Sequence, residues 1–570
     1  MTATDWDHSV DVLVVGSGNG GLTVALCCYE MGTKDVLVVE KSELMGGTSS
    51  ISGGGVWIPN NRYANAFTDM DSPEAARSYL MGCLPLDKVP QEMIETYLDA
   101  GPKMIDFLHE RTQVRYMNLE HYPDYYQECD GAMPGNRSME PEPINADELG
   151  DEYRKLRRCH HMMLLFGRIP FTQVEAALLM AQMPGWIKLV MGLILNYVLD
   201  IPWRLFGDKY SRRLTNGAAG VARLRVSMRE RNMPLWLESP MKELITEGDR
   251  VVGAVVEKDG KEMRIQARKA VVLAAGGFEH NQAMREQYLP KPTDHRWSGG
   301  AHENTGDAIR EGVRLGAKME QMDGAWWCNT ITAPGEPSPR LSIMEKSYPG
   351  SIVVNPAGER FANESMNYMA YQLETFEKHT DDYPCVPSWQ IFDAHFRASY
   401  MVGPLYNSKF RPDWALPASY EKEGFFARGD SLEELAAKID VDAEGLKATV
   451  EKFNGYAETG KDLDLQRGDS LYDRYYGDPR VEPNPVLGPI REAPFYAMKV
   501  DPGDFGTQGG MATTVNAEVR KEGGGVIPGL YAIGNCSAAV LPTYPGPGST
   551  LGPAMTFGFQ AAKHISGWQG

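Results

Sequence analysis

Three glycines and one acid near the start of the 570-residue chain have the spacing of a phosphate-binding site. Gly16, Gly18 and Gly21 form a GxGxxG motif, and Glu40 follows 19 residues after the last of them. The first glycine allows a tight turn, the second lets the backbone approach a pyrophosphate, and the third lets a helix pack closely on a strand. The acid is placed to bind a ribose diol. The motif therefore predicts a dinucleotide site.

The flanking residues supply the elements that must position this site. Residues 10–15, VDVLVV, are an apolar, β-branched run that predicts a strand buried in a parallel sheet. The following LTVALCCYEMG predicts a helix, and DVLVVE predicts a second strand that ends at Glu40. The helix N-terminus would bind the phosphate through free N–H groups and its dipole. A tight turn in a fold without a ligand would not explain why all these pieces coincide.

A second run of small residues, GGTSSISGGG at 46–55, distinguishes a flavin from a nicotinamide. Such a loop can press against a bulky planar ring while its N–H and hydroxyl groups bind phosphate and ring heteroatoms. A simple NAD domain has no need of it. The arrangement resembles the FAD-dependent flavoprotein family of fumarate reductase and the ketosteroid dehydrogenases.

Two later segments fit the same resemblance. KAVVLAAGG at 269–277 is similar to the strand that returns under FAD, and GLYAIGN at 529–535 resembles the late strand and turn at the flavin pyrophosphate. The FAD domain is therefore expected to open the chain, to be interrupted, and to close at the C-terminus. No histidine lies in 46–55, where covalent flavoproteins of the succinate dehydrogenase type carry their attachment site, so FAD is expected to be held non-covalently.

The resemblance also implies a set of cofactor-binding residues and no metal site. They are Gly16, Ser17, Gly18, Asn19, Gly20, Gly21, Glu40, Lys41, Gly47, Thr48, Ser49, Ser52, Gly53, Gly54, Ala275, Gly276, Gly277, Asn304, Asp307, Gly534, Asn535, Gly548 and Leu551.

Three tyrosine-bearing motifs carry the candidate chemistry. They are YPDYY at 122–126, NESMNY at 363–368 and YPGPG at 544–548. Taken singly, each tyrosine could be a packed aromatic with a satisfied hydroxyl. Together on an FAD fold they resemble 3-ketosteroid Δ1-dehydrogenase, which has PDYY, NES-x-x-Y and YPGPG motifs in this order.

The resemblance implies a role for each matching residue. Tyr368 would be the general base that removes a C2 proton, and Tyr125 would assist it by hydrogen bonding. The Tyr544 hydroxyl and the Gly548 N–H would bind the 3-keto oxygen and stabilise the developing enolate. The C1 hydride would pass to the flavin N5. The implied activity is FAD-dependent 1,2-desaturation of a 3-ketosteroid, with an external electron acceptor.

Three other functions compete with this one. A 3-ketosteroid Δ4-(5α)-dehydrogenase has the same fold, but the PDYY segment favours Δ1. A fumarate-reductase-like flavoprotein needs arginine and histidine for two carboxylates; His302, Arg296 and Arg360 are present, without a dicarboxylate motif. A non-catalytic flavin- or sterol-binding protein at a membrane surface would be favoured by loss of the base, but Tyr368 is present.

The predicted fold class is α/β, with a Rossmann-like FAD-binding domain split in sequence and an α+β catalytic cap domain. Residues 1–324 are the first part of the FAD-binding domain, 325–505 the catalytic cap, and 506–570 the second part. In the cap, SLEELAAKI and DAEGLKATVEKFNGYAE have the apolar spacing of helices with solvated charges.

Residues 154–213 depart from compact members of the family as a helical, membrane-associating insertion. Ten basic and three acidic residues give this segment a net charge of +7, and Trp186, Tyr197, Trp203 and Tyr210 are interspersed. Its charge-free runs, such as 189–199, are far too short to cross a bilayer. Apolar helices with aromatics and basic flanks favour an anchor on anionic lipid at about 160–206.

A homo-oligomer contact and an ordinary buried hairpin are the alternatives for this insertion. If it faces lipid, substrate could enter from the membrane, which favours steroids with a long apolar side chain. In this respect the chain resembles the cholest-4-en-3-one Δ1-dehydrogenase subgroup.

Composition limits the partners and the compartment. A net charge of −19 argues against nucleic acid, because phosphate neutralisation needs a basic face. Eight cysteines without a CxxC pair favour reduced thiols over a disulfide framework or a zinc site. The N-terminal MTATDWDHSVDVLVVG lacks the basic region of a secretory signal. We expect a cytoplasmic protein that associates peripherally with the inner face of the membrane.

Overall fold

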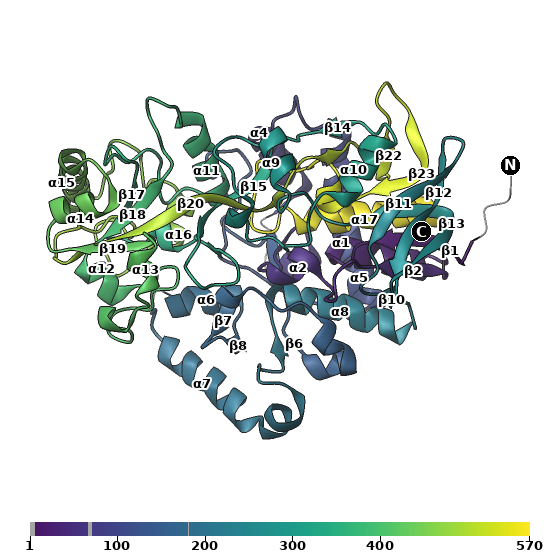
Figure 1. The fold of residues 1–570 in the computed structure, drawn as a ribbon, viewed down its shortest axis with the longest axis horizontal. Helices are drawn as coiled ribbons and strands as arrows, with labels where there is room; N and C mark the ends of the chain where they lie inside the picture. The colour runs from purple at the N-terminus through teal and green to yellow at the C-terminus, as the bar shows by residue number, and fades with distance from the viewer. Residues whose placement is uncertain (1–5, 66–70, 181, 570) are drawn as a thin grey trace.

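Two sheets, each covered by helices, form the two ends of the molecule, and a helical segment projects below them in Figure 1. This computed structural model describes residues 6–65, 71–180 and 182–569. The fold is of the mixed α/β type. The two sheets come from different parts of the chain, and the site lies where they meet.

The larger sheet has eight strands, and its parallel part joins the beginning of the chain to its end. The parallel neighbours, in spatial order, are β10 (Leu235–Trp236), β2 (Val36–Val39), β1 (His8–Val15), β13 (Lys261–Leu273) and β23 (Val526–Ala532). The strands β11 (Met241–Glu247), β12 (Arg250–Lys258) and β22 (Glu518–Arg520) extend the sheet with antiparallel pairs.

The register of these strands brings their carboxyl ends to one edge. Val15 pairs with Val39 and with Leu273, and Leu273 pairs with Ala532. The residues that follow each strand are therefore gathered side by side. The predicted order of strand, helix α1 (Asn19–Glu30) and strand is confirmed, and Leu13 at the centre of β1 is fully buried, as expected of a sheet covered on both faces.

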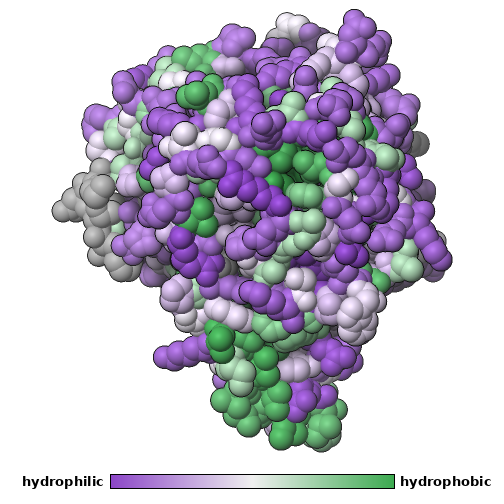
Figure 2. All heavy atoms as spheres, turned by 90° about the vertical axis from the view of Figure 1, so that its left-hand side faces the viewer, coloured by the Kyte–Doolittle hydropathy of each residue, from purple (hydrophilic) through white to green (hydrophobic). Residues whose placement is uncertain are grey.

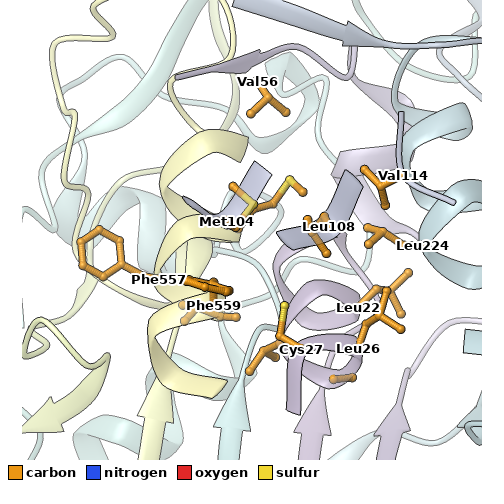
Figure 3. Close-up of a cluster of buried hydrophobic side chains, with 14 of the residues drawn as sticks. Leu22, Leu26, Cys27, Val56, Met104, Leu108, Val114, Leu224, Phe557 and Phe559 are labelled. Carbon is orange, nitrogen blue, oxygen red and sulfur yellow. The ribbon is translucent and has the colours of Figure 1, made fainter. Parts of the chain in front are cut away.

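Helices from distant parts of the sequence pack together over this sheet. Helix α17 (Leu551–Ser566) lies against α1 and α5 (Gln91–Arg111), and α8 (Asn216–Glu230) also packs on α1. Figure 3 shows their apolar contact, formed by Leu22, Leu26 and Cys27 of α1, Met104 and Leu108 of α5, Leu224 of α8, and Phe557 and Phe559 of α17. Burial raises the pKa of the neighbouring Cys28 thiol to about 12, and all eight cysteines are free.

The segment at 46–55 differs from the predicted loop, because part of it is helical. Gly47–Ile51 forms the short helix α2, and β3 (Val56–Trp57) follows directly after it. Gly46 has a φ of 109°, a left-handed conformation that glycine adopts without strain and that turns the chain into the helix. Strand β13 is also longer than the predicted 269–277 segment, since its first half pairs with β12.

The second sheet has six strands, all with antiparallel partners. They are β15 (Ala325–Ile331), β16 (Arg340–Leu341), β17 (Ser351–Val354), β18 (Ser388–Phe392), β19 (Phe426–Gly429) and β20 (Phe495–Thr507). The two helices predicted there are α14 (Leu432–Ile439) and α15 (Ala443–Thr459), and their buried faces complete the core of this unit. We call this unit the cap.

The insertion exposes much of its apolar surface. It contains α6 (Gln173–Met180), α7 (Trp186–Leu199) and the single π-helical turn η3 (Trp203–Gly207). Its exposed large hydrophobic residues are Phe166, Val174, Ile187, Met191, Leu195, Val198, Leu199, Ile201, Leu205 and Phe206. Figure 2 shows a patch of hydrophobic surface on the part that projects at the bottom of the molecule. None of the described helices combines the length and the apolar character needed to cross a membrane.

A buried ion network in the cap holds the turn that contains the NES motif. The Glu364 carboxylate pairs with Arg360 at 2.6 Å and with Arg467 at 3.2 Å, and Arg360 also pairs with Asp462 at 2.8 Å. Arg467 further donates to the main-chain carbonyl of Ser351. Burial alone would raise the pKa of Glu364, but Arg360 and Arg467 lower it to about 2.

We expect Glu364→Gln to destabilise the protein by about 3–5 kcal/mol at neutral pH, because it leaves buried guanidinium groups without their carboxylate. The folded-state pKa is below the ordinary value of about 4.3, so this stabilisation is present above pH ~4.3 and declines as the pH falls towards 2. Urea unfolding of both proteins between pH 7 and pH 3 would measure the difference.

The difference in the free energy of unfolding between wild type and Glu364→Gln should therefore become smaller at acidic pH. Glu444→Gln is a matched control, since that carboxylate is 84% exposed. A gap that stays constant over the whole pH range would contradict the assignment of a charged Glu364.

Candidate active site

One pocket runs along the carboxyl edge of the parallel sheet. Gly16 follows β1, Glu40 follows β2, Ala275 lies just beyond β13, and Gly534 lies just beyond β23; all four line the pocket. The Glu40 carboxylate accepts hydrogen bonds from the backbone N–H of Ser17 at 3.0 Å and from its hydroxyl at 2.7 Å. An acid and a glycine turn from two adjacent strands are thus fixed next to each other.

Two glycines are required by close backbone contacts. At Gly16, where φ is +110°, a Cβ atom would lie 2.2 Å from the carbonyl oxygen of Ala274. At Gly21 it would lie 2.1 Å from the carbonyl oxygen of Gly16. Neither position can hold a side chain without moving the sheet edge. Gly18 is less crowded, and its nearest neighbour would be the Ser49 hydroxyl at 3.2 Å.

Polar side chains from the other wall of the pocket are held by mutual hydrogen bonds. Asn304 donates to the Thr48 hydroxyl at 3.0 Å and to Glu279 at 2.6 Å, and Lys41 pairs with Asp307 at 2.6 Å. Burial raises the pKa of Glu279 to about 7. Sequence reasoning missed Glu279, because an acid that supports an asparagine from 25 residues away has no local signature.

The pocket gathers most of the predicted cofactor-binding residues. Those that line it are Gly16, Ser17, Gly18, Gly20, Gly21, Glu40, Lys41, Gly47, Thr48, Ser49, Ser52, Gly53, Gly54, Ala275, Gly276, Asn304, Asp307, Gly534, Asn535, Gly548 and Leu551. Asn19 and Gly277 lie outside the lining. Asn19 is fully buried, and a Cβ on Gly277 would meet the Thr507 hydroxyl at 2.1 Å.

The three predicted tyrosines meet at the other end of the same pocket. The ring centroids of Tyr125 and Tyr368 are 5.6 Å apart, those of Tyr125 and Tyr544 are 5.8 Å apart, and those of Tyr368 and Tyr544 are 5.7 Å apart. Each side chain is at most 5% exposed, and all three line the pocket. We call these residues the tyrosine triad.

Different elements hold each member of the triad. Tyr368 is the first residue of helix α11 (Tyr368–Lys378), which the side chain of Asn367 caps by accepting from the N–H of Ala370 at 2.8 Å. The N–H of Tyr125 donates to the carbonyl of Pro545 at 2.9 Å, which joins the PDYY segment directly to the YPGPG segment.

The YPGPG segment itself is tightly packed. Gly548 has a φ of +107°, and a Cβ there would lie 2.5 Å from the backbone of Gly55. Burial raises the pKa of Tyr544, and the neighbouring Tyr368 hydroxyl partly offsets this. Tyr544 and Gly548, the two donors predicted to bind a carbonyl oxygen, both line the pocket.

Burial dominates the electrostatics of the triad. It raises the pKa of Tyr368 well above its usual value, and the charges of nearby tyrosines add to this, while a hydrogen bond from Tyr125 lowers it. Burial also raises the pKa of Tyr125. The hydroxyls are therefore protonated at neutral pH in the protein alone.

Further tyrosines surround the triad, and sequence reasoning gave them no role. Helix α16 (Leu471–Tyr475) and the residue after it supply Tyr472, Tyr475 and Tyr476, and the Tyr122 hydroxyl bonds to those of Tyr125, at 3.4 Å, and of Tyr476. The i, i+3, i+4 spacing of Tyr472, Tyr475 and Tyr476 could have indicated that they lie together, because residues spaced in this way share one face of a helix.

The insertion forms an apolar wall of the pocket, which the sequence did not indicate. Met162, Met163, Val174 and Ala177 line it from the insertion, together with Leu341, Ile343 and Met344 of the cap. Val174 is also 53% exposed, so the pocket opens to the surface beside α6. A large apolar ligand could thus extend from the tyrosine triad to the insertion.

The residues considered for a dicarboxylate site do not come together. Arg360 is buried in the ion network, Arg296 is exposed and pairs with Asp294, and the His302 ring packs at a tilt against that of His280. None of the three belongs to the residues that line the pocket. Among the described residues, no group of three or more histidines, cysteines and acids could hold a metal ion.

The pocket has features that fit an elongated dinucleotide with a ring system. The Thr550 hydroxyl lines it, is buried, and has no hydrogen-bond partner among the described residues. At Gly47 a Cβ would meet nothing within 4 Å, so the backbone there faces open space. A bound phosphate or flavin ring would give the Thr550 hydroxyl a hydrogen-bond partner and would fill the space beside Gly47.

Comparison with known proteins agrees with this geometry. Residues 11–551 match the FAD binding domain family. A crystal structure of 3-ketosteroid Δ1-dehydrogenase from Sterolibacterium denitrificans in complex with 1,4-androstadiene-3,17-dione has a TM-score of 0.94 and 45% identity, covering 99% of this chain and 100% of that one. The 3-oxosteroid 1-dehydrogenase of Mycolicibacterium smegmatis is 39% identical over 98% of this chain and 97% of its own length.

A relative that is named for a different substrate also aligns with nearly the whole chain. The 4-oxocyclohexanecarboxylate 2-dehydrogenase of Sinomonas cyclohexanicum is 36% identical over 98% of this chain and 93% of its own length. By its domain match and its near-complete alignment with such relatives, the chain belongs to the 3-ketosteroid Δ1-dehydrogenase family of FAD-binding flavoproteins.

Proposed function

We propose that the protein is an FAD-dependent oxidoreductase that introduces the C1–C2 double bond of 3-ketosteroids. The observation that carries this proposal is the continuity of one pocket from the glycine edge of the parallel sheet to the tyrosine triad. A cofactor bound along the first part would present its ring to a substrate held by the second. The 45% identity to an enzyme solved with a steroid dienone supports this substrate class.

The cofactor would be bound non-covalently by a Rossmann-like domain that is split in sequence into 1–324 and 506–570, with 325–505 as the catalytic cap. Glu40 would accept from a ribose, the N–H groups after Gly16 would meet the pyrophosphate, and Thr550 would gain a partner. When bound, FAD supplies the acceptor, at its N5 atom, for the C1 hydride. An external electron acceptor completes each turnover.

The chain's own residues would activate the ketone. The Tyr544 hydroxyl and the Gly548 N–H would donate to the 3-keto oxygen, which withdraws charge from the ring and acidifies the C2–H bond. Because both groups are buried, their hydrogen bonds act in a medium of low dielectric, where they stabilise developing negative charge more strongly than in water.

Tyr368 would then accept the C2 proton, with Tyr125 stabilising the phenolate by hydrogen bonding. The raised pKa of Tyr368 makes it a strong base in the small fraction of molecules that have lost the proton. The rate of flavin reduction should therefore increase with pH through the alkaline range.

The substrates that fit best are steroids with a long apolar side chain, such as cholest-4-en-3-one. The apolar wall of the insertion would contact the side chain, and the exposed insertion tip would rest on anionic lipid at the inner face of the cytoplasmic membrane. The net charge of +7 on the insertion favours that attachment.

Anaerobic titration of the holoenzyme with androst-4-ene-3,17-dione and with cholest-4-en-3-one tests the reaction. We expect both steroids to bleach the flavin absorbance and to yield the C1–C2 unsaturated product, with tighter binding of the long-tailed one. A product desaturated at C4–C5 would indicate the Δ4-(5α) activity instead. Reduction only by 4-oxocyclohexanecarboxylate, or reoxidation of reduced enzyme by fumarate, would overturn the steroid assignment.

Tyr368→Phe should lower the rate of flavin reduction by about 10²–10⁴-fold, as expected when a proton-transferring group is removed. Steroid affinity, measured by the change in flavin absorbance, should change little. Tyr371→Phe is the matched control, because Tyr371 is buried on the same helix but does not line the pocket. A wild-type rate in Tyr368→Phe would exclude Tyr368 as the base.

Leu205→Glu together with Phe206→Glu should abolish cosedimentation with vesicles that contain anionic lipid. These side chains are 70% and 84% exposed at the insertion tip, where two carboxylates would oppose both burial and the lipid charge. FAD content and turnover of androst-4-ene-3,17-dione should stay unchanged. Point variants are preferable to a deletion of 160–206, which would remove the pocket wall. Wild-type protein that remains in the supernatant would refute the anchor.

A further inference from the structure

A second apolar protrusion lies on the cap, outside the insertion. Phe410 is 68% exposed, and Trp414, at 87%, is the most exposed of the large hydrophobic residues that the structure describes. Large aromatic side chains are rarely left this open to water without a function. We call residues 406–416 the cap protrusion.

The cap protrusion is held in place rather than loosely attached. Asp413, beside Trp414, accepts from the Tyr496 hydroxyl at 2.7 Å and pairs with Arg397 at 3.3 Å. Arg397 is itself buried and donates to the carbonyl of Arg411 at 2.9 Å. A buried arginine thus holds the segment between the two aromatic residues, so their exposure is built into the fold.

The cap protrusion adjoins the insertion. The ring of Trp186, at the start of α7, meets the ring of Phe410 edge-to-face, with centroids 6.0 Å apart. Leu416 packs against the same cap core as Met180, the last residue of α6, and Met183 beyond it. The exposed aromatic residues of the cap therefore adjoin the insertion.

Basic side chains accompany both apolar surfaces. Arg204 donates to the carbonyl of Val198 and Arg411 to that of Ala415, and neither pairs with a carboxylate among the described residues. Lys188 and Lys409 flank Trp186 and Phe410 in sequence and likewise join no ion pair in the described part of the chain. Asp413, the only acid of the cap protrusion, is already neutralised by Arg397.

Exposed tryptophan and phenylalanine beside unpaired cations match the interfacial layer of an anionic bilayer, where amphipathic aromatics and basic groups are both stabilised. We propose that the cap protrusion is a second lipid-contacting element, so that a bilayer touches both the insertion and the cap. This inference rests on the proposed membrane attachment of the insertion. It adds a contact from the catalytic cap itself.

Flotation of the holoenzyme with vesicles of phosphatidylcholine and phosphatidylglycerol tests the proposal. Phe410→Ala together with Trp414→Ala should weaken binding by at least about tenfold, since two aromatic side chains no longer leave water. Leu463→Ala is the matched control, because Leu463 is a 77% exposed residue on another segment of the cap. FAD content reports folding, and neither aromatic residue lines the pocket.

A spectroscopic measurement locates the contact directly. The emission of Trp414 is obtained by subtracting the emission of Trp414→Phe from that of wild type. In vesicles with brominated acyl chains, this emission should be quenched. Wild-type binding that is lost in the Leu205→Glu, Phe206→Glu protein but unchanged in Phe410→Ala, Trp414→Ala, without Trp414 quenching, would overturn this inference and leave the insertion anchor intact.

Two other outcomes would also overturn it. If the wild-type protein fails to float, both proposed membrane contacts are refuted, whereas the proposed steroid chemistry is unaffected. A wild-type dimer in sedimentation equilibrium that Phe410→Ala, Trp414→Ala converts to a monomer, with unaltered vesicle binding, would identify the cap protrusion as a contact between copies of this chain.

Discussion

The site depends on how closely the backbone approaches itself at the carboxyl edge of the parallel sheet. Gly16 lies against Ala274 and Gly21 lies against Gly16, at separations that no Cβ could occupy. These contacts bring the ends of β1 and β13 together, while the register with β2 and β23 adds Glu40 and Gly534 to the same edge. A cofactor pocket at this edge is therefore a consequence of strand order and of missing side chains.

The tyrosine triad is assembled by the contact between this sheet-based domain and the cap. Tyr125 and Tyr544 are joined through the carbonyl of Pro545, whereas Tyr368 comes from a cap helix whose preceding turn is fixed by the Glu364 ion network. Charged groups thus lie behind Tyr368, and apolar rings surround it. The burial of this side chain raises the pKa of the proposed base, and the hydrogen bond from Tyr125 partly offsets this.

The insertion has apolar side chains on two faces, one towards the pocket and one on the molecular surface. Its inner side chains, such as Met163 and Ala177, line the pocket, and its outer ones, such as Phe206, are open to the surroundings. In a chain with a net charge of −19, a segment of +7 that also exposes hydrophobic residues is set apart electrostatically from the rest of the molecule. This segment is the face that we propose contacts anionic lipid.

The sequence by itself determined the local elements, because strand and helix periodicity and glycine spacing act over a few residues. The βαβ unit, the helices α14 and α15, and the glycine turn at Gly16 were predicted in this way. The expected roles of the three tyrosines in the triad came from resemblance to a family. Only the tertiary structure decided which side chains share a cavity: the α16 tyrosines beside Tyr122, Glu279 behind Asn304, the pocket wall formed by the insertion, and the exclusion of Asn19 and Gly277 from the lining. The physical reason is that side-chain direction and proximity across hundreds of residues are set by packing between elements, which no local pattern encodes.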